Sequence, residues 1–198
     1  MLNDRSSTLS LLATRRSGRP RDLIAPGPSA AELRQILEAA VRVPDHGKLH
    51  PWRFVHVAQE ERPALQALLL DAYRDDHAQP GRLEIEAVER FAGQAPELLV
   101  ALFSPKESKI PVWEQELSCG AACMNLLLAT HALGYAGGWV TGWAAYSDKV
   151  RDAFGQAPER IAGFFFIGTP CGPLEERPRP AFDEVVSRWN GLPDRHRA

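Results

Sequence analysis

Two arginines and a serine stand together near the start of the chain, at Arg15, Arg16 and Ser17. Two guanidinium groups beside a hydroxyl suit a phosphate or another planar anion, because each guanidinium presents a fixed fork of N–H donors. A simpler interpretation is that arginines at the C-terminal end of a helix oppose the negative end of its dipole. Residue types alone favour the simpler interpretation. Nucleic acid is not expected, since no aromatic stacking motif accompanies the cluster and the net charge is -2.

The loop at residues 42–52 is a second segment that could carry chemistry. A helix is predicted to end at Pro44, Gly47 follows, and a strand comes next. Binding groups tend to lie on such loops between regular elements. His46 and His50 have the spacing of two metal ligands on a helix, but the glycine between them argues against a helix and no third ligand is near. We therefore expect no metal site.

Residues 117–147 contain no Asp, Glu, Lys or Arg, which predicts a buried helix that runs into a glycine-rich strand. Small residues three and four apart predict a face on which a second helix, in the domain or in a dimer, packs closely. These residues are Ser118, Ala121, Ala122, Asn125 and Ala129. A membrane span is not expected, because such a helix needs about 20 predominantly apolar residues and polar side chains and glycine interrupt this one.

The third segment that could carry chemistry is the glycine-rich stretch 137–143, which surrounds Trp139. Glycine lets the backbone come close to something flat or bulky, such as a planar ligand. The alternative interpretation is a crowded strand end that packs on the long helix.

Length and composition indicate one soluble domain over residues 1–198. Residues 1–12 carry Asp4 and Arg5 and no uninterrupted apolar core, so no signal peptide is recognised and a cytoplasmic location is expected. Cys119 and Cys123 lie one helical turn apart in apolar surroundings and are interpreted as reduced core residues. No base stands visibly beside them, which argues against a catalytic thiol.

The elements that must position these segments alternate irregularly along the chain. Helices are predicted at 9–16, from a capping box at 29–32 to Pro44, at 62–74, at 83–91 and after Ser147. Strands are predicted at 53–58, at 97–104, around Trp139 and at 161–168. The proline-containing tail from Cys171 is expected to lie along another surface. The pattern predicts an α+β domain with about four strands enclosed by helices.

In this order, the segments resemble the nitroreductase family of FMN-dependent oxidoreductases, and within it the short, single-domain YdjA-like branch. The resemblance rests on residues 15–17, 42–52, 112–116, 137–142 and 163–170. It implies a nitroreductase-like fold with a central, mostly antiparallel sheet enclosed by helices. It also implies an intertwined homodimer with two FMN sites at the subunit interface.

The same resemblance implies which residues hold the phosphate of FMN. Arg15, Arg16 and Ser17 match the first FMN-binding turn of the family. Arg177 and Arg179 resemble a basic element near the C-terminus that adds positive charge at the phosphate.

Four residues on the 42–46 loop are implied to act across the dimer. Arg42 and His46 match positions that reach the FMN of the partner subunit, and Pro44 and Asp45 lie between them. Close by, Lys48 and His50 depart from the Asn and Gln of many relatives.

Further positions are implied at the flavin ring and at the reductant. Trp139, Val140 and Thr141 match the segment that runs beside the isoalloxazine, although the YdjA-like branch has Arg where Val140 stands. Ala129 matches a site assigned to the nicotinamide dinucleotide.

The implied activity is passage of hydride from NADH or NADPH through FMN to a nitroaromatic, a quinone or a similar conjugated acceptor. A ping-pong mechanism is expected, because one site must release the nicotinamide before it admits the acceptor. No general acid or base is implied. The alternative is a non-catalytic FMN-binding carrier or sensor protein.

Overall fold

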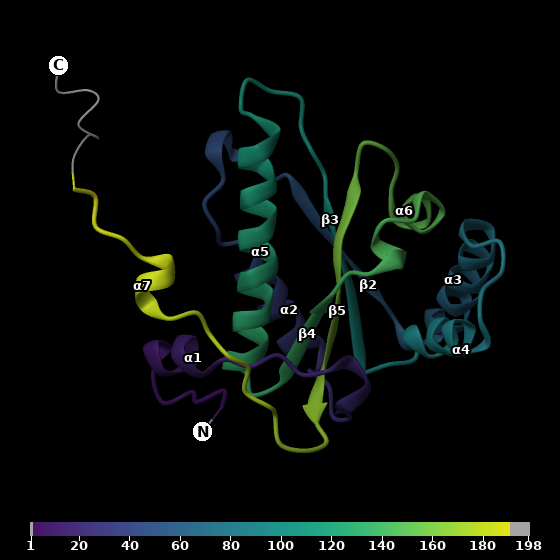
Figure 1. Cartoon of the computed structure of the whole chain (residues 1–198), viewed down its shortest axis with the longest axis horizontal. Coiled ribbons are helices and arrows are strands. Elements are labelled where there is room, and N and C mark those ends of the chain that lie inside the picture. The colour runs from purple at the N-terminus through teal and green to yellow at the C-terminus, as the bar shows by residue number, and fades with distance from the viewer. Residues whose placement is uncertain (1, 191–198) are drawn as a thin grey trace.

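The computed structural model describes residues 2–190 and builds them around a five-stranded sheet (Figure 1). β3 and β5 lie in the middle of the sheet, in the order β1-β5-β3-β2, and β4 also pairs with β5, over residues 164–168. Every pairing is antiparallel, so the predicted central antiparallel sheet is confirmed. The strands are β1 (Leu23–Ile24), β2 (Trp52–Val57), β3 (Glu97–Phe103), β4 (Ala136–Val140) and β5 (Arg160–Pro170).

Helices cover both faces of this sheet (Figure 1). α2 and α5 pack on one face, and α3 and α4 pack on the other together with α6. The α-helices are α1 (Thr8–Thr14), α2 (Ala30–Ala40), α3 (Arg62–Asp76), α4 (Arg82–Phe91), α5 (Val112–Ala132), α6 (Asp148–Phe154) and α7 (Phe182–Val185). Short 3₁₀ turns are η1 (Pro20–Asp22), η2 (His46–Lys48), η3 (Gln59–Glu61) and η4 (Trp143–Ala145).

β3 is buried on both faces, as its continuous apolar run predicts. Because successive side chains of a strand point to opposite faces, Leu98 and Leu102 enter the core beneath α3 and α4, whereas Leu99 and Phe103 enter the core beneath α2 and α5. One strand therefore joins the two hydrophobic cores and fixes the helix layers relative to each other.

The helix predicted to run to Pro44 ends earlier, at Ala40. Its start is as predicted, because Ser29 and Glu32 form both hydrogen bonds of the capping box. Its end is set by a partner on α5. The side-chain amide of Asn125 donates to the carbonyl oxygens of Ala39 (3.1 Å) and Arg42 (3.0 Å), which satisfies the last turn without further helix.

Two of the small residues of α5 face their own chain, and contact of this helix with a second copy stays a prediction. Ala122 is fully buried in the core shared with α2, and Ser118 donates from Oγ to the Pro44 carbonyl oxygen at 2.6 Å. Over residues 2–190, no helix combines the length and the apolarity that a bilayer crossing demands.

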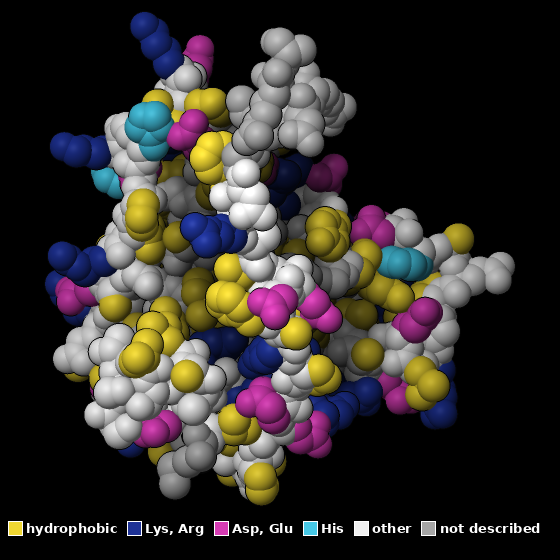
Figure 2. Space-filling view, turned by 60° about the vertical axis from the view of Figure 1, so that its left-hand side comes forward, with side chains coloured by type: hydrophobic (Ala, Val, Ile, Leu, Met, Phe, Trp, Pro, Cys, Tyr) yellow, Lys and Arg dark blue, Asp and Glu magenta, His cyan; other side chains and the backbone are white. Residues whose placement is uncertain are grey.

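The chain after β5 returns along the sheet and then leaves it. Cys171 donates its backbone N–H to the Asp22 carbonyl oxygen at 2.9 Å, beside the two-residue strand β1, which the sequence analysis did not predict. α7 stands apart from the body in Figure 1. Figure 2 brings this side forward and shows hydrophobic side chains to both sides of the C-terminal segment. On that segment Phe182 and Trp189 are strongly exposed.

Trp139 on β4 is fixed by a glycine on β5. Its indole stacks on Phe165 (centroids 5.3 Å apart) and donates from Nε1 to the Ala162 carbonyl oxygen at 3.0 Å. A Cβ atom at Gly163 would overlap the indole Nε1 and Cδ1. Gly163 therefore provides the space in which the indole lies.

We expect Gly163→Ala to displace the Trp139 indole and to lower the free energy of unfolding by about 1–3 kcal/mol, because overpacking forces neighbouring groups to move. Urea unfolding gives the free energy, and tryptophan fluorescence reports the displacement. Gly93→Ala is the matched control, since a Cβ there meets no atom within 4 Å. Equal stability of the two variants would contradict this packing role.

Candidate functional site

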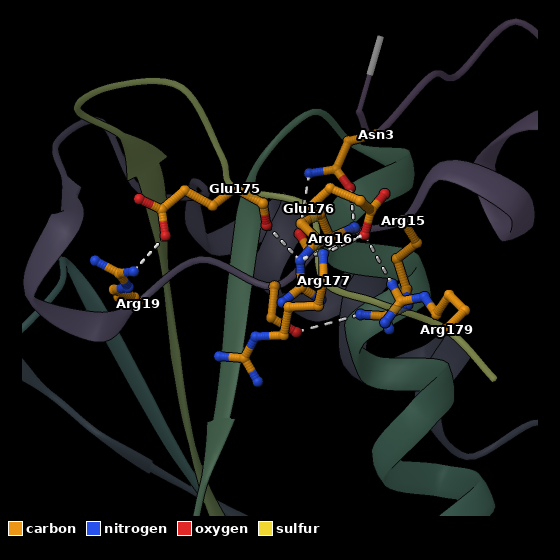
Figure 3. A network of polar contacts seen from close by, with 9 residues as sticks. Asn3, Arg15, Arg16, Arg19, Glu175, Glu176, Arg177 and Arg179 are labelled. Atoms are coloured by element: carbon orange, nitrogen blue, oxygen red, sulfur yellow. Dashed lines mark hydrogen bonds and ion pairs between the residues drawn. The ribbon is translucent and has the colours of Figure 1, made fainter.

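Four arginines from the two ends of the chain converge near the C-terminal end of α5 (Figure 3). Arg15 and Arg16 follow α1, and Arg177 and Arg179 lie on the C-terminal segment. The sequence analysis predicted that these four act together, and the structure places them together.

Arg16 is the buried member of this arginine cluster. Its Nε donates to the Glu175 carbonyl oxygen at 2.7 Å. Its backbone N–H donates to Oδ1 of Asn3 at 2.6 Å, and Nδ2 of Asn3 donates back to the Arg16 carbonyl oxygen at 3.2 Å. Asn3 and Glu175 thus hold the turn rigidly from both ends of the chain, a role that no motif in the sequence indicated.

The cluster carries more positive charge than its neighbours neutralise. Burial lowers the pKa of Arg15 and of Arg16, and repulsion from the neighbouring guanidinium groups lowers both pKa values further. Glu176 offsets part of this repulsion, with Oε1 3.3 Å from Arg179 Nη2 and 3.9 Å from Arg16 Nε. One carboxylate against four guanidiniums leaves the cluster suited to a bound anion.

A cavity of about 140 Å³ opens beside these arginines. Arg16, Ser17 and Arg177 line it, and the Ser17 hydroxyl accepts a hydrogen bond from Arg15 Nη1 at 3.2 Å. Three carboxylates, of Asp22, Glu175 and Glu176, also line it and balance its three arginines. The excess of guanidinium groups lies in the arginine cluster beside the cavity, and that cluster is the place suited to a phosphate group.

The turn after Arg16 lies directly against β4. Gly18 donates its backbone N–H to the Gly137 carbonyl oxygen at 3.2 Å. A Cβ atom at Gly138 would lie 2.6 Å from the Gly18 carbonyl oxygen, so glycine is needed for this approach. The arginine-rich turn and the glycine-rich strand therefore form one continuous surface.

The last residues of β4 and its following turn differ in their surroundings. Trp139 is 38% exposed, and Thr141 is exposed. Val140 packs partly against the core beneath α3 and α4, so this side chain belongs to the core. Within the described residues β4 pairs with no strand other than β5, and the Gly18 turn covers its other edge at Gly137 and Gly138, which leaves that edge open only from Trp139 onward.

The loop with Arg42, Pro44, Asp45 and His46 runs beside α5 toward its N-terminal end, since Asn125 donates to the Arg42 carbonyl and Ser118 to the Pro44 carbonyl. His46 Nδ1 lies 2.6 Å from Glu114 Oε2, in the first turn of that helix. The Asp45 carboxylate accepts the backbone N–H groups of residues 49 and 50, which folds the loop into a compact turn. Between residues 2 and 190, no hydrogen bond or ion pair joins this loop to the arginine cluster.

Ala129 is placed away from β4. It is partly buried on α5 and lines a groove of about 330 Å³ between α5 and α1, together with Leu11 and Leu12. Its predicted role at a nicotinamide dinucleotide stays a prediction.

The structure also locates the histidines and cysteines. In the described part of the chain, no three His, Cys, Asp or Glu side chains are grouped so that they could hold a metal ion. Cys119 and Cys123 are free and buried, as predicted, and Cys171 is free and exposed.

The comparisons with known proteins agree with this architecture. The model of the nitroreductase family matches residues 12–169. A Haemophilus influenzae protein provisionally named NAD(P)H nitroreductase is 38% identical over 81% of this chain and 87% of its own length. The provisionally named NAD(P)H nitroreductase YdjA of Escherichia coli K12 is 36% identical over 82% and 87%. The crystal structure of an FMN and NADPH-dependent nitroreductase from Sphigopyxis sp. strain HMH superposes with a TM-score of 0.70, at 23% identity, over 94% of this chain and 100% of that one.

One buried residue near the arginine cluster was missed by the sequence analysis. His131 is fully buried near the end of α5, and neither ring nitrogen has a hydrogen-bond partner among the described residues. Burial, and then the charge of Arg15, lower its pKa from 6.5 to about 4. The imidazole is therefore neutral in the folded protein at neutral pH.

We expect this histidine to make the protein sensitive to acid. Below pH 6.5 the unfolded chain binds a proton that the folded chain binds only near pH 4, so stability is lost as the pH falls through this window. Between pH 7 and pH 5 the loss from this group is about 2 kcal/mol. Urea unfolding at both pH values measures it. His131→Leu should lose less stability than the wild type over the same interval, and an equal loss would contradict the assignment.

Proposed function

This chain belongs to the nitroreductase family, and from that premise we propose that it is an FMN-dependent oxidoreductase. It takes hydride from NADH or NADPH and passes it, by a ping-pong mechanism, to a nitroaromatic, a quinone or a similar conjugated acceptor. The observation that carries the proposal is the arginine cluster joined to the open edge of β4. The names of the two bacterial relatives support an oxidoreductase that uses NAD(P)H.

The phosphate end of the cofactor is assigned to the arginine cluster. Arg15, Arg16, Arg177 and Arg179 supply positive charge, and Ser17 supplies a hydroxyl beside Arg15. Burial and mutual repulsion disfavour the charged form of these guanidiniums in the free protein. A bound phosphate dianion would offset this electrostatic repulsion.

The ring end is assigned to the segment Trp139, Val140 and Thr141. The open edge of β4 offers backbone N–H and C=O groups to a planar ligand. When bound, FMN supplies the hydride-transfer chemistry, and the protein supplies position and electrostatics. No side chain is assigned as a general acid or base.

The nicotinamide dinucleotide is assigned to the side of α5 that carries Ala129. A cytoplasmic location and a single domain over residues 1–198 stay predictions; residues 1 and 191–198 lie outside the described residues.

A homodimer follows from the positions of the two halves of the site. Ser118, which holds the 42–46 loop, and His131, beside Arg15, are separated by about 20 Å along α5, at 1.5 Å per residue. A single chain therefore does not bring His46, which contacts Glu114 in the first turn of α5, to the arginine cluster. Two copies with antiparallel α5 helices place the loop of one beside the arginines of the other, with the two-fold symmetry usual for dimers.

The surface for this contact is the outer face of α5. Leu117 is 54% exposed and Trp113 is 66% exposed, on a helix whose other faces are buried. Exposed apolar surface of this kind marks interaction sites. The C-terminal segment adds Phe182 and Val185, which its own chain leaves uncovered.

We expect the purified protein to be yellow and to release FMN, rather than FAD or riboflavin, on denaturation. Arg15→Glu should keep the fold and lose the colour, because a charge-assisted contact to phosphate is worth about 1.5–3 kcal/mol and the reversed charge adds repulsion. Absorbance at the flavin band and circular dichroism measure the two properties. Arg82→Glu, on the exposed side of α4, is the control. Full FMN occupancy in Arg15→Glu would refute the phosphate assignment.

We expect dimerisation and FMN binding to be coupled. Leu117→Asp places a charge on the outer face of α5. It also removes the stabilisation that Leu117 would give when the dimer contact buries it, about 1.5–3 kcal/mol. The variant should be monomeric and should bind FMN weakly, because each site then lacks the partner's loop. Size-exclusion chromatography with flavin absorbance measures both properties. Leu83 is also an exposed leucine, on α4, and the control variant Leu83→Asp should stay dimeric and yellow. A monomer that keeps its flavin would show that the site is not shared.

A further inference from the structure

His131 is a buried histidine that the proposed function leaves unused. It lies in the last turn of α5, its side chain is fully buried, and neither Nδ1 nor Nε2 has a hydrogen-bond partner in the described part of the chain. A buried polar group without a partner costs stability, whereas an apolar side chain of similar shape avoids that cost. The imidazole therefore adds nothing to packing that a leucine would not.

The segments that position the arginine cluster also enclose His131. His131 and Asn3 line the same cavity, of about 460 Å³, and Asn3 holds the backbone of Arg16 through two hydrogen bonds of 2.6 and 3.2 Å. The chain after β5 closes this cavity with Pro173 and Leu174. His131 thus lies next to the turn that carries the cluster, on its inner side.

The charged groups that face His131 are positive. Arg15 is close enough for its charge to add to the effect of burial, and together they lower the pKa of His131 to about 4. Arg5 lines the cavity from the N-terminal segment, and Tyr135 lines it from the turn after α5. Burial and a hydrogen bond to Glu32 raise the pKa of Tyr135, which keeps this phenol neutral. Of the described residues that line the cavity, none is a carboxylate.

An anion at the arginine cluster changes this balance. A phosphate dianion beside Arg15 offsets the positive charge that opposes a proton on His131. Water and salt screen this effect little, because the imidazole is buried. The pKa of His131 is therefore higher in the anion-bound protein than in the free protein. The bound form takes up its proton at the higher pH, so the affinity for the anion increases as the pH falls toward 4.

We propose that His131 couples the arginine cluster to pH, taking up a proton when a ligand with a phosphate group binds, so that the ligand is held more tightly in acid. His131 is a positioning residue for this charge and touches no ligand, since it is fully buried. The inference rests on the proposed function, because it takes the phosphate of FMN to lie at the arginine cluster.

The test compares how the affinity for FMN changes with pH in the wild type and in His131→Leu. The FMN-loaded proteins are diluted at pH 7 and at pH 5, and the fluorescence of the released FMN gives the dissociation constant. The phosphate of FMN also takes up a proton in this interval, but it does so in both proteins and cancels in their ratio. We expect the ratio of wild-type to variant affinity to be about three- to tenfold larger at pH 5 than at pH 7.

His56→Gln is the matched control. His56 lies on β2, where Nε2 is 2.6 Å from Oε2 of Glu97, and it has no contact with the arginine cluster among the described residues. This variant should keep the pH dependence of the wild type. His46 and His50 are unchanged in all three proteins, so their titration cancels in the comparison.

An NMR titration measures the same coupling in the wild type alone. In the FMN-loaded protein, the imidazole signal of His131 should titrate clearly above pH 4, the value that burial and Arg15 set without an anion. If His131→Leu does not fold, this measurement decides.

The outcomes separate the two proposals. Equal pH dependence in the wild type and His131→Leu, or a His131 signal that titrates at about pH 4 with FMN bound, overturns the coupling and leaves the FMN site standing. A wild type that binds no FMN overturns the phosphate assignment. The NMR titration in sodium sulfate against sodium chloride, at equal ionic strength, then decides the coupling, because sulfate stays divalent over this pH range.

Discussion

The contact between the turn after Arg16 and the glycines of β4 determines what this surface can bind. The N–H of Gly18 bonds to the Gly137 carbonyl oxygen, and the absence of a side chain at Gly138 lets the two backbones meet. This contact ties an arginine-rich turn, which α1 and the C-terminal segment support, to an edge strand of the sheet. A larger residue at Gly138 would push the arginine-rich turn away from the strand edge and leave two unconnected surfaces.

The arginine cluster is stable only because other contacts offset its repulsion. Asn3 and the Glu175 carbonyl hold Arg16 in place, and Glu176 lies among the guanidiniums. These contacts come from segments about 160 residues apart in the chain. Close to these contacts, His131 is buried without a hydrogen-bond partner among the described residues. The region thus carries unfavourable electrostatics and an unsatisfied imidazole, features that are usual where a binding site is built at the expense of stability.

The sequence predicts the parts of this structure that short-range patterns encode. The capping box at Ser29, the buried run of β3 and the glycine-rich segment of β4 are where the patterns place them, and the family motifs identify the fold. The end of α2 could not be predicted, because an amide from α5, Asn125, sets it. Periodicity also does not tell which partner a helix face contacts, so the sequence left open whether the small residues of α5 meet a helix of the domain or of a second copy; Ala122 packs in the core shared with α2.

The arginine cluster and the cavity of about 440 Å³ beside Trp139 differ in charge balance, and this difference bears on how one surface can treat two kinds of ligand. At the arginine cluster, guanidiniums outnumber carboxylates, so a phosphate there is attracted and fixes the orientation of whatever carries it. At the cavity beside Trp139, Arg151 and Arg160 are each already paired with a carboxylate, so charge gives no such attraction. A ligand held by its charge at the arginine cluster can therefore stay bound while uncharged molecules exchange beside Trp139.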